Sequence, residues 1–212
     1  MAAGPEASHR SSARTRLTRD ERRAHFLDTA AEIIKTRGAD AVTMEGVAAQ
    51  AGVSKALGYR YFANSDALLL ALFDREVEVL DHRTVHAVAS AERFEDRLRA
   101  VVEVWLDLIV ERGRLMGSLQ RSKLIEGPIE QRRLSRQHDI DAFFASLILD
   151  QYEMSDDDAL FAAGAMLAST EGALRLWLAQ GWTRDEVCDR FMRFTIGAIE
   201  ALAGPARGGG RD

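Results

Sequence analysis

Five side chains in the segment 54–61 have the chemistry to bind a polyanion: Ser54, Lys55, Tyr59, Arg60 and Tyr61. They supply a hydroxyl, two cations and two phenols. Groups of these kinds bind phosphate oxygens and the edges of bases in nucleic acids. A helix that is slim and polar at its N-terminal end also fits the major groove of DNA. The segment is therefore a candidate nucleic-acid-binding helix.

The residues before this segment predict the elements that position it. Thr43 is a candidate N-cap for a short helix that reaches about residue 50, and Ser54 is one for the polar helix. Between the two helices, Gly52 can take a positive φ and form a tight turn. Val47 and Val53 are placed to bury the angle between them. This pattern indicates a helix-turn-helix.

Other candidate chemistry in the sequence is weaker. Glu78, His82 and His86 repeat at helical spacing, as ligands of a divalent metal do, but no fourth ligand is evident, which favours a solvated helix face and no metal site. Cys188 is the only cysteine, so neither an intrachain disulfide nor a cysteine-based zinc site can form. No nucleophile-elbow, Walker or zinc-protease motif occurs. The sequence thus predicts no enzyme, no catalytic residue and no cofactor.

The composition favours an all-α protein. Alanine is abundant, β-branched runs are scarce, and the chain of 212 residues has only 3 prolines. Apolar residues recur at helical spacing in about nine segments, with one ambiguous segment at about 116–125. No apolar run approaches the roughly 20 residues that span a bilayer, and no signal peptide is evident. We therefore expect a cytoplasmic protein with no membrane partner.

The charge is unevenly distributed along the chain. Residues 1–75 hold 11 Lys and Arg against 9 Asp and Glu, whereas residues 76–212 hold 17 against 24. The first third is thus slightly basic, and the remainder has a net charge of −7. A basic end on an acidic body is expected where that end meets a polyanion.

Helix-capping residues and compositional breaks suggest how the chain is organised. We expect a disordered basic arm at 1–17, a three-helix helix-turn-helix head at 18–64, a helical body at 65–204 and a disordered tail at 205–212. Gly113 is expected to end the first long helix of the body, and Pro128 to open the next one.

The segment 43–68 contains Thr43, the pattern VAxxAGVS at 47–54, YRYF at 59–62 and NxDAL at 64–68. Together these residues resemble the tetracycline-repressor (TetR) family of bacterial transcriptional regulators. The resemblance is specific over about a third of the chain. It implies a homodimer with an operator-binding head and an effector-binding body, most simply a repressor that a small, largely apolar effector releases from DNA. Such a protein would be associated with the nucleoid when bound to its operator.

The resemblance also assigns roles within the head. Ser54, Lys55 and Ala56 are expected nearest the base edges. Phosphates are expected to contact Thr43, Tyr59, Arg60 and Tyr61.

Two positions depart from the family pattern. Gly58 stands where the family has a large aliphatic residue, and Ser65 where it has a phosphate-binding lysine. A glycine at position 58 implies lost packing and a mobile polar helix, which would be the recognition helix. The two departures support a second hypothesis, a helical small-molecule-binding or scaffold protein with weakened DNA binding.

The body is expected to hold the effector pocket and the dimer interface. The last two long helices, at about 156–180 and 183–203, carry small residues at every fourth position, which allow close helix packing. The interface candidates are Gly164, Ala168, Gly172, Phe191, Phe194, Gly197 and Ala201. The pocket candidates are Trp105, Leu108, Phe143, Phe144, Leu147, Met166, Ser169, Thr170 and Trp177.

Overall fold

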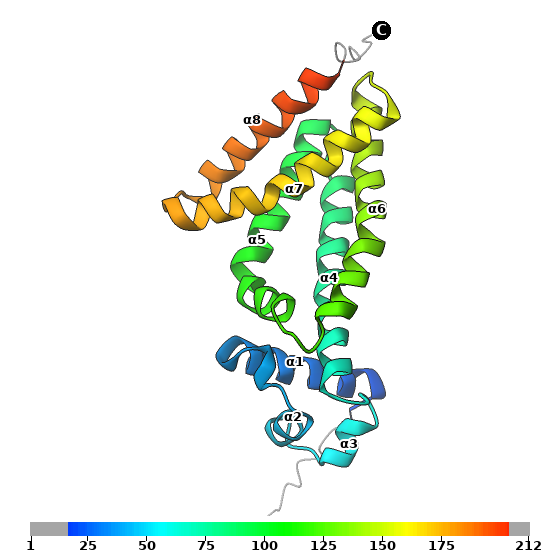
Figure 1. The fold of residues 1–212 in the computed structure, drawn as a ribbon, viewed down its shortest axis with the longest axis vertical. Helices are drawn as coiled ribbons and strands as arrows, with labels where there is room; N and C mark the ends of the chain where they lie inside the picture. Colours follow the sequence, from blue (N-terminus) through cyan, green and yellow to red (C-terminus); the bar gives the residue numbers. More distant parts are fainter. Residues whose placement is uncertain (1–16, 204–212) are drawn as a thin grey trace, which may run out of the picture.

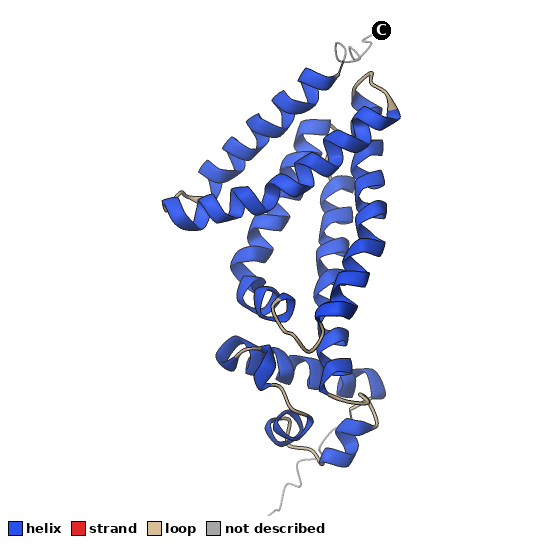
Figure 2. Cartoon of the chain, viewed as in Figure 1, coloured by secondary structure: helices blue, strands red, loops and turns tan. Residues whose placement is uncertain are grey.

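A computed structural model describes residues 17–203, which contain eight α-helices, one short 3-10 helix and no strand (Figure 2). The all-α class is thereby confirmed. The basic arm, except for Leu17, and the tail lie outside the described residues. None of the described helices is long and apolar enough to cross a membrane. The elements are α1 (Arg19–Arg37), η1 (Ala39–Ala41), α2 (Met44–Gln50), α3 (Lys55–Tyr59), α4 (Ser65–Ala89), α5 (Phe94–Gln120), α6 (Glu126–Gln151), α7 (Asp156–Gln180) and α8 (Arg184–Leu202).

Six helices begin at a residue whose side chain accepts a hydrogen bond from the backbone N–H three residues ahead. Two of these residues, Thr43 and Ser54, are the N-caps that the sequence predicts. At Thr18 and Thr183 the bond is part of a reciprocal capping box with a glutamate. The six caps are Thr18, Thr43, Ser54, Asn64, Ser155 and Thr183.

Two predicted helix boundaries in the body are wrong. α5 continues through Gly113 to Gln120, and α6 begins at Glu126, before Pro128. The last turns of α5 bury Leu115 and Leu119 completely. That apolar burial exceeds the roughly 1 kcal/mol that a glycine costs in a helix interior. Residues 116–120 of the ambiguous segment are thus the end of α5, and residues 121–125 connect α5 to α6.

The buried residues form two clusters that share helices α5 and α6. The head cluster includes Phe26 of α1 and Leu69 of α4, together with Leu119 from the end of α5. The body cluster includes Leu106 of α5 and Ile199 of α8. In Figure 1, α1–α3 lie at one end of the molecule, α7 and α8 lie toward the other, and α4, α5 and α6 run between them. α5 and α6 therefore belong to both cores, and α4 extends from the head core alongside α5.

Polar contacts reinforce the junction between the head and the body. The Glu76 side chain of α4 is only 2% exposed and pairs with Arg75 at 3.2 Å and with Arg112 of α5 at 3.0 Å. Arg75 also reaches Asp28 of α1 at 2.7 Å. These pairs join α1, α4 and α5 in one ionic network, at the point where the two cores meet.

Candidate nucleic-acid interface and internal cavity

The turn between α2 and α3 has the geometry of a helix-turn-helix. Thr43 caps α2 by accepting from the Gly46 N–H at 3.0 Å, and Ser54 caps α3 by accepting from the Leu57 N–H at 3.3 Å. Gly52 adopts φ +68°, the left-handed conformation that favours glycine. Val47 is fully buried in the head cluster, and Val53 packs against it. Both helices are therefore held by the residues that the sequence singled out.

Six of the seven predicted DNA contacts are exposed in this structure, and the seventh is half-buried. The exposed residues are Thr43, Ser54, Lys55, Ala56, Tyr59 and Arg60. Tyr61 packs its ring against Phe26, with ring centroids 5.7 Å apart. The Tyr61 side chain thus contributes to the head core as well as to the surface.

Lys55 has an acidic partner that the sequence analysis missed. Its ammonium group pairs with the Glu45 carboxylate of α2 and lies 5.6 Å from the centre of the Tyr59 ring. The hydrogen bond between the two groups lowers the pKa of Glu45 and raises the pKa of Lys55. Both side chains are well exposed, so solvent screens this pair and a phosphate can replace Glu45.

Gly58 allows the recognition helix to pack tightly, so the interpretation of a lost packing contact is wrong. It is the buried residue of α3. A Cβ atom built on it would lie 3.3 Å from Met44 Cε and 3.6 Å from Phe26 Cε1. The space of the expected aliphatic side chain is therefore filled by residues of α1 and α2. At the other departure, the Ser65 hydroxyl donates to Asp66 at 3.3 Å, beside the Asn64 cap of α4.

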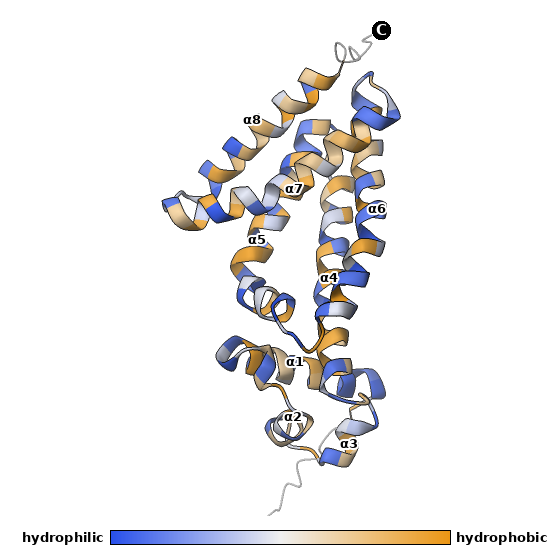
Figure 3. Cartoon of the chain, in the orientation of Figure 1, coloured by the Kyte–Doolittle hydropathy of each residue, from blue (hydrophilic) through white to orange (hydrophobic). Residues whose placement is uncertain are grey.

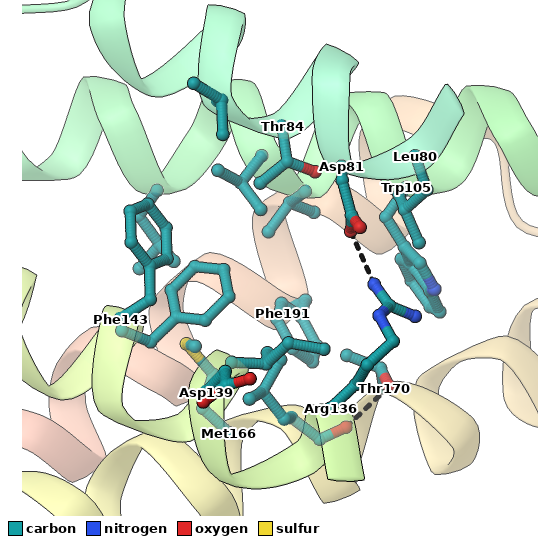
Figure 4. Close-up of a pocket in the computed structure, with 17 residues that line it drawn as sticks. Leu80, Asp81, Thr84, Trp105, Arg136, Asp139, Phe143, Met166, Thr170 and Phe191 are labelled. Atoms are coloured by element: carbon teal, nitrogen blue, oxygen red, sulfur yellow. Dashed lines mark hydrogen bonds and ion pairs between the residues drawn. The ribbon is translucent and has the colours of Figure 1, made fainter. Parts of the chain in front are cut away.

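A cavity of about 410 Å³ lies among α4, α5, α6, α7 and α8 (Figure 4). Its size falls within the roughly 300–1,000 Å³ of small-molecule sites. The structure brings together five of the nine predicted pocket residues in its lining: Trp105, Phe143, Phe144, Met166 and Thr170. Phe191, predicted for the dimer interface, is buried instead and lines the same cavity, with its ring centroid 6.2 Å from that of Trp105.

Four predicted pocket residues lie elsewhere. Leu147 lines a smaller neighbouring pocket, and Leu108 lines neither of the two. The Ser169 hydroxyl is used within α7, where it donates to the Met166 carbonyl at 2.6 Å. Trp177 donates its indole N–H to the Trp182 carbonyl at 2.9 Å, next to the α7–α8 turn. Helical periodicity predicts which face of a helix points inward. It does not predict which residues of that face line the cavity.

The sequence analysis also missed the polar part of the lining. Asp81 and Thr84 come from α4, and Arg136 and Asp139 from α6. Asp81 and Arg136 point toward one another in Figure 4 and form an ion pair at 2.5 Å. Asp81 and Thr84 lie one turn apart on α4, and Arg136 and Asp139 lie one turn apart on α6. This spacing is a weak signal for a site, because solvated helix faces have the same spacing.

Large apolar side chains of α7 and α8 are left uncovered by the residues that the structure describes. Figure 3 shows hydrophobic residues along both helices. Phe161 is 66% exposed and Phe194 is 61% exposed. A Cβ atom built on Gly164, Gly172 or Gly197 would meet nothing within 4 Å. Ala168 and Ala201 are exposed on the same two helices. A monomer rarely leaves such an extended apolar surface in water.

The titratable groups elsewhere form no comparable site. Residues 17–203 hold no group of three or more His, Cys, Asp and Glu side chains placed to bind a metal ion. The Cys188 thiol is buried in the body core, and burial raises its pKa. A thiol in this state is a weak nucleophile.

The chain is similar to known bacterial regulators over both the head and the body. The sequence model for "Bacterial regulatory proteins, tetR family" matches residues 26–72. The HTH-type transcriptional activator FasR of Mycolicibacterium smegmatis is 30% identical over 165 residues, which span 77% of this chain and 75% of FasR. The HTH-type transcriptional regulator BetI of Rhizobium meliloti is 35% identical over 83 residues, or 39% of this chain and 41% of BetI.

Solved structures show the same fold. A TetR-like transcriptional regulator from Rhodococcus sp. RHA1 superposes with a TM-score of 0.68 at 21% identity, covering 87% of this chain and 98% of that chain. The fatty acid degradation regulator FadR from Bacillus halodurans has a TM-score of 0.70 at 15% identity, covering 87% and 99%. With the helix-turn-helix geometry and the similarity to FasR, these findings establish that the chain belongs to the tetR family of bacterial regulatory proteins and is a DNA-binding transcriptional regulator.

Proposed function

We propose that the protein is a homodimeric repressor that leaves its operator when a small, largely apolar effector enters the cavity. The observation that carries this proposal is the shared set of helices. α4, α5 and α6 each contribute to the head core and to the cavity lining. DNA binding requires one arrangement of these helices and of the heads they carry. A ligand that binds a different arrangement more tightly shifts the population away from the DNA-binding state, by an amount set by the difference between its affinities for the two arrangements.

The proposed division of labour follows the two ends of the molecule. Residues 18–64 form the DNA-binding unit, and residues 65–204 form the effector-binding and dimerisation unit. Within the head, Lys55 exchanges its Glu45 partner for a phosphate or a base edge, while Tyr59 and Arg60 bind phosphates. The exposure of all three side chains supports this docking. A protein with this role acts in the cytoplasm.

Alanine substitutions at Lys55 and Arg60 test the docking. Each is expected to weaken binding to the operator, and each is expected to lower the slope of log affinity against log salt by about one if its cation binds a phosphate. The measurement is fluorescence anisotropy with the duplex immediately upstream of the protein's own gene, at two salt concentrations, with a scrambled duplex beside it. Arg175→Ala, which removes an exposed arginine of α7, is the matched control. Wild-type affinity in both head variants would rule out the proposed docking.

Activation is the second candidate function, because FasR is described as a transcriptional activator. A reporter gene placed behind the upstream DNA distinguishes the two. Repression predicts higher expression when the regulator is deleted, whereas activation predicts lower expression. The alternative of a scaffold with weakened DNA binding predicts no change in the reporter and equal, weak binding to both duplexes.

The exposed faces of α7 and α8 are the proposed dimer interface. Phe194→Asp is expected to convert the dimer to a monomer. Burial of an unpaired carboxylate in the interface costs far more free energy than burial of one apolar side chain contributes to dimerisation. Light scattering after size-exclusion chromatography measures the mass. Val110→Asp is the control, since Val110 is 70% exposed on α5 and lies outside this surface. A Phe194→Asp protein of unchanged dimeric mass would place the interface elsewhere.

A further inference from the structure

The cavity has an apolar interior. Its buried lining residues are all hydrophobic: Leu98, Val102, Phe144, Met166 and Phe191. The hydroxyl of Thr170 is already used within α7, where it donates to the Leu167 carbonyl at 2.6 Å. A polar ligand group placed among the buried side chains loses its water and gains little in return. The interior therefore suits a hydrocarbon or aromatic moiety.

The polar groups lie at the partly exposed rim. Asp81 and Thr84 approach from α4, and Arg136 and Asp139 approach from α6. Val85 of α4 is also exposed at this rim. Charged side chains and apolar rim residues that reach solvent mark this side as the mouth of the cavity. A ligand that fills the interior with an apolar tail keeps its polar head here, between α4 and α6.

The charges at the mouth select the sign of that head group. Asp81 is paired with Arg136 at 2.5 Å, whereas Asp139 forms no hydrogen bond or ion pair with the described side chains. Two carboxylates and one guanidinium leave a net charge of −1 at the mouth. A monocation brings this sum to zero, and a monoanion would bring it to −2. The part of the chain from 76 to 212 carries 17 basic and 24 acidic residues, so the wider field acts in the same direction.

We propose that the effector is a cationic amphiphile, an apolar tail with an alkylammonium head, bound with the tail inside the cavity and the head beside Asp139 and Asp81. This inference rests on the proposed effector function of the cavity and adds the chemical class of the ligand. The aromatic side chains of the lining, which include Trp105 and Phe143, suit a quaternary ammonium through cation–π attraction. An anionic head would have to compete with Asp81 for Arg136 and would face Asp139 as well.

Three probes with the same decyl chain test the head group: decyltrimethylammonium, decanol and decanoate. Isothermal titration calorimetry with the full chain is carried out at neutral pH, below the concentrations at which the probes form micelles. The cation is expected to bind about tenfold more tightly than decanoate, with decanol between them. Asp139→Asn is expected to lower the affinity for the cation about threefold or more and to leave decanol binding unchanged. Asp150→Asn, which removes an exposed charge of α6 outside the cavity lining, is the control for total charge.

The outcomes separate this inference from the proposed function. Decanoate binding as tightly as the cation, or more tightly, overturns the cationic class but keeps the cavity as a ligand site. If Asp139→Asn and Asp150→Asn lower the affinity for decyltrimethylammonium equally, the preference for a cation comes from the overall charge of the protein. That result overturns the proposed role of the carboxylates at the mouth. Failure of all three probes to bind overturns the proposed effector cavity together with the ligand class.

Discussion

Replacement of Gly58 by leucine is expected to lower the free energy of unfolding by about 1–3 kcal/mol, the range for overpacked cores. A Cβ atom at this position would lie 3.3 Å from Met44 Cε, and the Phe26 ring closes the space behind it. A leucine therefore cannot fit unless α3 moves away from α1 and α2. Because this movement displaces Lys55 and Tyr59, operator affinity is expected to fall as well.

Gly58→Ala separates steric overpacking from the loss of glycine. Alanine favours the helix by roughly 1 kcal/mol over glycine. Its one extra carbon would meet Met44 Cε, the mobile end of a flexible side chain. We therefore expect the alanine variant to stay within about 1 kcal/mol of the wild type. Urea unfolding of both variants measures the effects. A leucine variant more stable than the wild type would show that the position has room for the aliphatic residue typical of the family.

Glu76→Ala is expected to lower the free energy of unfolding by about 2–4 kcal/mol. Loss of one partner of a buried ion pair typically costs 3–5 kcal/mol, and the range is reduced here because the two arginines remain partly exposed. The side chains of Arg75 and Arg112 are 25% and 33% exposed. Without the carboxylate, two guanidinium groups face each other across α4 and α5, and only Asp28 continues to pair with Arg75.

Glu78→Ala is the matched control for this substitution, because Glu78 is exposed on the same helix. It is expected to change stability by less than about 0.5 kcal/mol. The measurement is the denaturation midpoint and slope in urea for each variant. If Glu76→Ala and Glu78→Ala unfold at the same urea concentration, the ionic network does not hold the head against the body.

The sequence by itself determined the all-α class, most of the helix starts and the helix-turn-helix. Each N-cap side chain bonds a backbone N–H three residues ahead, so the information for helix starts such as Thr43 and Ser54 is local. Gly52 likewise fixes its turn through its own backbone conformation. The residue types of the polar helix, which give it the capacity to bind phosphate, are a property of the sequence as well. For these reasons the class of protein could be predicted without coordinates.

Only the tertiary structure decided how the faces of these helices are used. Phe191 and Phe194 lie on one short stretch of α8, yet the first lines the cavity and the second is exposed. Gly58 appeared to leave a gap, but Met44 and Phe26 fill it from other helices. The Asp81–Arg136 pair joins residues far apart in the chain. Periodicity identifies an apolar face, whereas the partner of that face depends on packing between distant segments, which local bonding does not encode.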